Sequence, residues 1–61
     1  MNGKQVLQRL KDSGWTLDRV KGSHHIMIKA GKICPIPVHG ARDIPNGTLA
    51  KIAKIAGVKL S

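Results

Sequence analysis

Apolar residues recur with helical spacing near the beginning of the chain. Val6, Leu7 and Leu10 fall at positions i, i+1 and i+4, and the positions around them hold polar or charged residues. This spacing predicts an amphipathic helix over about residues 5–13, with one apolar stripe facing a core. Gly14 follows directly, and a glycine can adopt the left-handed conformation that ends many helices.

A second helical pattern lies near the other end of the chain. It begins near Pro45 or Asn46, with Asn46 as the N-cap or Pro45 as the first helical residue. Gly57 is expected to close this helix in the same way that Gly14 closes the first. The core-facing stripe is Leu49, Ile52, Ala53 and Ala56, widened by Ile55.

Three segments between these helices alternate in the manner of strands, at residues 15–20, 24–30 and 33–38. Tight turns at 22–23 and 31–32 separate them. The order α-β-β-β-α predicts an α+β domain over residues 1–61, with a three-stranded antiparallel sheet and two helices on one face. Prolines in the third segment lack backbone donors, so this strand is expected at an edge of the sheet.

Period-two alternation also assigns side chains to faces of the predicted sheet. Leu17 and Arg19 share a face of the first strand. In the second strand His24 shares a face with the apolar Ile26, so the count places His24 toward the helices. The same count places His25 on the open side.

The charge balance favours a polyanionic partner. The chain has 11 Lys and Arg against 3 Asp and Glu, a net charge of +8, which attracts phosphate polymers. A surplus of charge that serves solubility is the plainer alternative. Trp15 is the only aromatic residue, which argues against a single-strand reader that stacks bases on aromatic rings.

Other classes of protein are disfavoured. An apolar run of 18 residues and a signal-peptide pattern are both missing from the sequence, so we expect a cytoplasmic protein without membrane contact. Cys34 has no partner cysteine for a disulfide, and its spacing from the histidines fits no zinc motif. We therefore expect Cys34 in the core, and we expect neither a metal nor a small-molecule cofactor.

Two adjacent histidines follow the 22–23 turn, and they carry the candidate chemistry. Imidazole both takes and gives a proton near neutrality, and cations beside it would draw in a phosphate chain. Cleavage of RNA without a metal needs a base, an acid and cations for the developing charge. The candidate substrate-binding residues are Arg19, Lys21, Gly22, Ser23, His25 and Lys29, with His24 as the candidate catalytic residue.

The order of several motifs resembles the HicA family of toxin ribonucleases, over nearly the whole chain. They are Gly14-Trp15, Arg19, Gly22-Ser23-His24-His25, Pro37-Val38-His39, Ile44-Pro45-Asn46-Gly47-Thr48-Leu49 and Ile55-Ala56-Gly57. The resemblance implies a fold like that of double-stranded-RNA-binding domains, cleavage of mRNA that halts translation, and neutralisation by a HicB antitoxin. The family's catalytic histidine maps onto His24. The aliphatic stretch 26–28 departs from the aromatic or basic residues that many members carry there.

The two arguments about the histidines disagree, because alternation exposes His25 whereas the resemblance points to His24. We follow the resemblance, since a bulge at Gly22 would shift the register of the whole strand. His39 is expected to tie loop backbone together. Two alternatives to a nuclease stay open: a non-catalytic double-stranded-RNA-binding module, and a structural or ribosome-associated basic protein.

Overall fold

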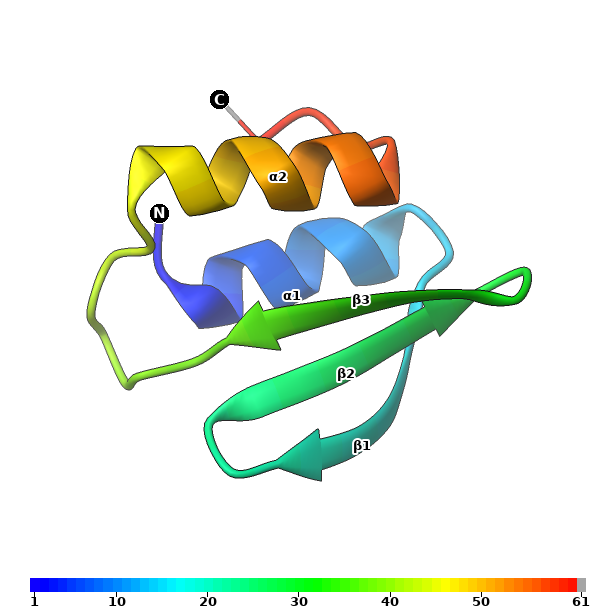
Figure 1. Cartoon of the computed structure of the whole chain (residues 1–61), viewed down its shortest axis with the longest axis horizontal. Helices are drawn as coiled ribbons and strands as arrows, with labels where there is room; N and C mark the ends of the chain where they lie inside the picture. The colour runs from blue at the N-terminus through cyan, green and yellow to red at the C-terminus, as the bar shows by residue number, and fades with distance from the viewer. Residues whose placement is uncertain (61) are drawn as a thin grey trace.

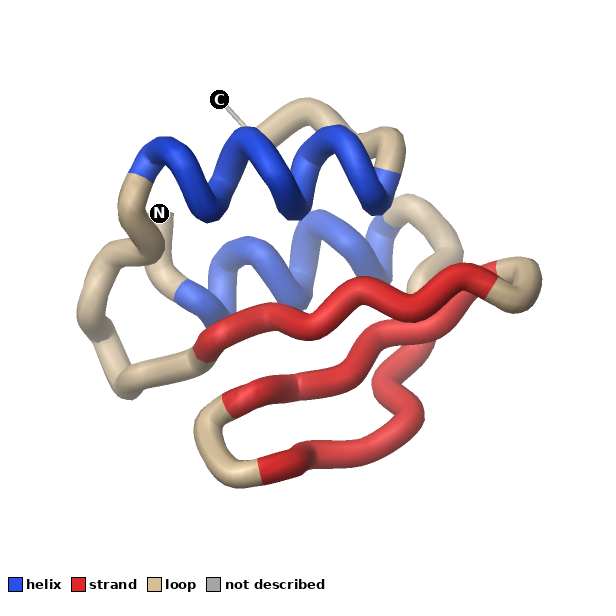
Figure 2. Tube along the Cα trace, in the orientation of Figure 1, coloured by secondary structure: helices blue, strands red, loops and turns tan. Residues whose placement is uncertain are grey.

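The chain folds into two layers, a sheet and a pair of helices. The computed structural model describes residues 1–60. Its elements are α1 (Gly3–Asp12), β1 (Thr16–Lys21), β2 (His24–Lys29), β3 (Lys32–Pro37) and α2 (Asn46–Ala56). The strands form one antiparallel sheet in the order β1-β2-β3, and both helices lie on the same side of it (Figures 1 and 2). The predicted α+β fold of the double-stranded-RNA-binding-domain type is confirmed.

Helix α1 begins two residues earlier than the apolar spacing indicated. The Asn2 side chain accepts from the backbone N–H of Gln5 at 2.9 Å, and the Gln5 side chain accepts from the N–H of Asn2 at 2.8 Å. This reciprocal capping box satisfies two donors that the first turn leaves without partners. At the other end Gly14 has a φ of 92°, as expected of a residue that terminates the helix.

Helix α2 begins without a side-chain cap. Pro45 occupies the N-cap position, so Asn46 is the first helical residue and not the N-cap. Gly57 ends the helix in the left-handed conformation, as predicted, with a φ of 66°. Of the predicted stripe, Ile52 is buried, whereas Ile55 is 47% exposed and does not widen it. Neither helix within residues 1–60 is long and apolar enough to cross a membrane.

The core lies between the helices and one face of the sheet. Met27 of β2 and Cys34 and Ile36 of β3 are fully buried on that face. They are part of a single cluster of buried residues: Val6, Leu7, Leu10, Trp15, Met27, Cys34, Ile36, Ile44, Ile52 and Leu60. The position of Cys34 in the core is as predicted. Burial raises the pKa of its thiol by desolvation.

The two edges of the sheet differ. Strand β3 is an edge strand, as its prolines predicted, and it lies against the helices (Figure 1). Strand β1 forms the opposite edge, and all six of its residues are exposed. Leu17 and Val20 of β1 are 43% and 53% exposed, because the two helices pack mainly over β3.

The assignment of the histidines to faces by alternation was wrong. Met27 faces the helices, so His25 shares that side and is half-buried, while His24 is exposed on the other side. We call this second side the open face; it carries His24, Ile26, Ile28 and the residues paired with them in β1 and β3. Period-two alternation could not identify the buried face, because aliphatic residues lie on both faces of β2.

The register of the sheet contains a bulge, at Asp18 rather than at Gly22. Leu17 pairs with Met27, but Arg19 pairs with Ile26, so Asp18 is the extra residue of β1. A bulge of this kind moves every residue beyond it to the other face. Arg19 therefore lies on the open face and does not share a side with Leu17.

Close contact between α1 and the end of β3 requires a glycine at position 3. A Cβ atom at Gly3 would lie 2.6 Å from the carbonyl oxygen of Pro37 and 2.8 Å from Val38. Real Cβ atoms do not approach so closely, so the absence of a side chain allows the helix to meet the strand here. This contact fixes the point at which the chain leaves the sheet.

The two isoleucines of β3 offer a matched test of this packing. Ile36→Ala should lower the free energy of unfolding by about 2–5 kcal/mol, because it removes a fully buried side chain. Ile33→Ala, at a position that is 63% exposed on the same strand, should change it by about 0.5 kcal/mol or less. Urea denaturation followed by circular dichroism measures both. Equal losses would contradict the described division between faces.

Burial of Cys34 also has a chemical consequence. The thiolate is the nucleophile, and both burial and the raised pKa disfavour it in the folded chain. Iodoacetamide at mildly alkaline pH should therefore modify the native protein much more slowly than the urea-unfolded protein, as followed by mass spectrometry. Equal rates in the two states would contradict a core position for this cysteine.

Candidate functional site

The turn between β1 and β2 presents His24 at one end of the sheet. Lys21 and His24 pair directly across the two-residue turn formed by Gly22 and Ser23. Gly22 has a φ of 61°, which suits the left-handed conformation of a hairpin turn. His24 is the first residue of β2 and is exposed, so its ring is accessible from the solvent.

Two cations share the open face with His24. Residues paired across an antiparallel sheet lie on the same side, so Lys21 flanks His24, and Arg19 flanks Ile26 in the next row. The Arg19 Nε atom lies 3.8 Å from the Asp18 carboxylate, and the Arg19 side chain is 72% exposed. Such exposed ion pairs contribute little, so the guanidinium stays accessible to a phosphate.

His25 lies on the helix side of the sheet, whereas period-two alternation placed it on the open side. It pairs with Val20 on one side and with the fully buried Ile36 on the other. Its ring is half-buried, and within residues 1–60 its Nδ1 atom is buried without a hydrogen-bond partner. This placement turns His25 away from the face that carries His24.

Lys29 does not lie near His24, which corrects the expectation that it does. Four residues of β2 lie between them, a distance of roughly 17 Å at the usual rise of a strand. The Lys29 ammonium donates to the carbonyl oxygen of Ser13, at the end of α1. It also borders a hollow of about 450 Å³ beside the β2–β3 turn. This turn lies at the end of the sheet opposite the β1–β2 turn (Figure 1).

The Gly22-Ser23 turn has a backbone contact that sequence reasoning missed. The carbonyl oxygen of Ser23 accepts a hydrogen bond from the backbone N–H of Val38 at 2.8 Å. The segment after β3 therefore begins beside this turn, on the side opposite Lys21. The second turn consists of Ala30 and Gly31, one residue earlier than predicted, because Lys29 pairs with Lys32. It is this register that places Pro37, and not His39, opposite His24.

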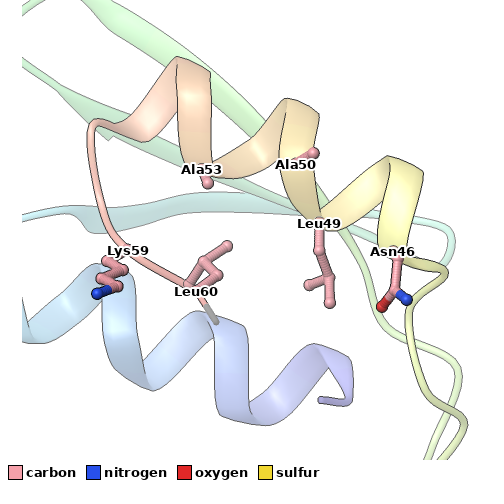
Figure 3. A pocket seen from close by; sticks show the side chains of 6 residues that line it. All are labelled: Asn46, Leu49, Ala50, Ala53, Lys59 and Leu60. Carbon is pink, nitrogen blue, oxygen red and sulfur yellow. The ribbon is translucent and has the colours of Figure 1, made fainter.

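A separate groove lies on the helix side of the molecule. It measures about 480 Å³ and is bordered by Asn46, Leu49, Ala50, Ala53, Lys59 and Leu60 (Figure 3). Its walls are α2 and the segment that follows it, so no residue of the open face lines it. Within residues 1–60 no three His, Cys, Asp or Glu side chains come together as a possible metal site.

The comparisons with known proteins support one family. No curated protein matches the chain. The family model for the HicA toxin of bacterial toxin-antitoxin systems matches residues 3–58, which includes both helices and the whole sheet. The matched region therefore contains the Gly-Ser-His turn and the open face described above. Because this match spans nearly the full sequence, the chain belongs to the HicA family, the toxin component of bacterial toxin-antitoxin systems.

Proposed function

We propose that this toxin is a metal-independent endoribonuclease that cleaves mRNA and thereby inhibits translation. The observation that carries the proposal is the exposure of His24 on a sheet face that also carries Arg19 and Lys21. An accessible imidazole can act as the base or the acid of RNA cleavage, and the two cations beside it can stabilise the developing charge. Membership of a toxin family supplies the cellular context.

The chemistry follows from the positions of these groups. In its base form His24 takes the proton of the ribose 2′-hydroxyl, whose oxygen attacks the adjacent phosphorus. The bond from phosphorus to the 5′-oxygen breaks, and that oxygen leaves with a proton supplied by a general acid. Arg19 and Lys21 bind the phosphate and stabilise the negative charge that develops on it. The site is open, because a chain of 61 residues has little room for a deep pocket.

The remaining predicted substrate-binding residues have different roles in this proposal. Gly22 and Ser23 shape the turn that presents His24, and His25 supports β2 from the helix side. Lys29 has no part in the proposed site, because it lies at the other end of β2 on the same side as Met27, and its ammonium donates to the carbonyl oxygen of Ser13. Recognition then depends mainly on phosphates and on the ribose 2′-hydroxyl groups.

A toxin-antitoxin system implies an antitoxin that controls this toxin. We propose a HicB-like protein that covers the open face with an acidic surface. Such a surface would complement the net charge of +8 and would block access to His24 at the same time. Burial of one face by the antitoxin thus accounts for both binding and inhibition.

Replacement of the candidate catalytic residue tests the proposal. His24→Ala should abolish growth arrest when expressed without an antitoxin, and should slow RNA cleavage about 10²–10⁴-fold, because it removes the proton-transfer group. Growth curves and gel analysis of messenger RNA measure these effects. Gln8→Ala, on the outer face of α1, is the control and should retain full activity.

The outcome distinguishes the enzyme from a simple RNA-binding module, whose fold is the same. If the wild type and His24→Ala bind RNA equally and neither cleaves it, the result would favour a non-catalytic RNA-binding module. Thermal melting of His24→Ala should match the wild type closely, since an exposed residue contributes little packing. A large loss of stability would instead indicate a structural role for this histidine.

Binding should depend steeply on salt, because phosphate contacts release counterions. Lys21→Ala should weaken RNA binding and reduce the slope of log K against log salt by about 1, as expected for one lost phosphate contact. Lys54→Ala, an exposed cation of α2 on the other side of the molecule, is the matched control with a smaller effect. Fluorescence anisotropy with an inactive His24→Ala background measures both slopes. Identical slopes for the two variants would contradict a phosphate contact at Lys21.

A further inference from the structure

The pairing of β2 with β3 continues one residue beyond the strands. His24 pairs with Pro37, and just beyond this pair the N–H of Val38 donates to the carbonyl oxygen of Ser23 at 2.8 Å. Val38 is partly buried and packs against the core, so its side chain lies on the helix side. The extended backbone therefore keeps its alternation through Val38.

This alternation brings His39 to the open face. His39 follows Val38 and is exposed. Continued by one residue, the alternation assigns it to the side of Pro37 and His24. In an antiparallel sheet, residues in this diagonal relation have Cα atoms about 7–8 Å apart, within reach of ring side chains. The alternation thus assigns two imidazoles to one face, at the same end of the sheet.

The backbone holds His39 in this position from both sides. The N–H of Arg42 donates to the carbonyl oxygen of His39 at 3.1 Å, so a turn begins at this residue. On the other side, the close approach of Gly3 to Val38 fixes the preceding residue against α1. His39 is thus placed by the fold, at the point where the chain leaves the sheet.

We propose that His39 is a second catalytic residue, the acid that protonates the leaving oxygen. This rests on the proposed nuclease function. His24 takes the proton of the 2′-hydroxyl, the O2′–P bond forms and the P–O5′ bond breaks. The imidazolium of His39 gives its proton to O5′. The products are a 2′,3′-cyclic phosphate and a 5′-hydroxyl, and the two histidines end with their protonation states exchanged.

The other nearby groups fit the acid role less well. His25 lies on the helix side, and its Nδ1 atom is buried. Lys21 lies beside His24 on the open face, but imidazole exchanges protons near neutrality more readily than an ammonium group. Among residues 1–60, His39 is the remaining histidine, and the alternation assigns it to the same face as His24.

A substrate with a better leaving group tests this role. The cleavage site is first mapped on a messenger RNA, and an oligoribonucleotide spanning it is made with either oxygen or sulfur at the bridging 5′ position. A thiolate leaves without being protonated, so loss of the acid should matter only for the oxygen substrate. His39→Ala should slow cleavage of the oxygen substrate about 10²-fold or more, and of the sulfur substrate only a few-fold.

Three further measurements complete the test. His24→Ala should slow both substrates, and Gln8→Ala should slow neither. His39→Gln should repeat the differential effect of His39→Ala. The ratio of the two rates within one preparation does not depend on the fraction of protein that is folded.

The possible failures are distinguishable. Equal slowing of the two substrates by His39→Ala, or no slowing of either, would overturn the acid role of His39. Full activity of His24→Ala on the oxygen substrate would instead overturn the proposed nuclease site itself.

Discussion

The packing of Met27, Cys34 and Ile36 beneath the two helices is the constraint on which the rest of the structure depends. Within residues 1–60 the buried side chains form one small core, and these three commit one face of the sheet to it. Strand alternation then directs their neighbours to the opposite face. His24 reaches the solvent because the residues that must be buried lie on the other side of β2 and β3.

Two local irregularities convert this exposed face into a site with several cations. The bulge at Asp18 moves Arg19 to the open face, although Leu17 just before it points toward the helices. The turn at Gly22 places Lys21 directly opposite His24. The bulge and the turn add little to the core, but they determine where the charges of Arg19 and Lys21 lie. The fold thus separates the residues that stabilise it from those that would bind RNA.

Exposure on a flat sheet has consequences for a toxin. A site without walls depends on placed charges and proton donors rather than on a shaped cavity. The hydrogen bond between Val38 and Ser23 matters here, because it joins the segment after β3 to the turn that precedes His24. The same openness would allow an antitoxin to inhibit the toxin by covering one face.

The sequence by itself determined the order of the elements, the two helical stripes and the edge position of β3, because each rests on local spacing or on the missing donors of Pro35 and Pro37. It also identified the Gly-Ser-His turn. Tertiary structure alone decided which face of β2 is open, since Ile26 and Met27 are both apolar and only the position of the helices selects between them. The bulge in β1 and the pairing of His24 with Pro37 likewise depend on contacts between strands, which residue spacing along one strand does not record.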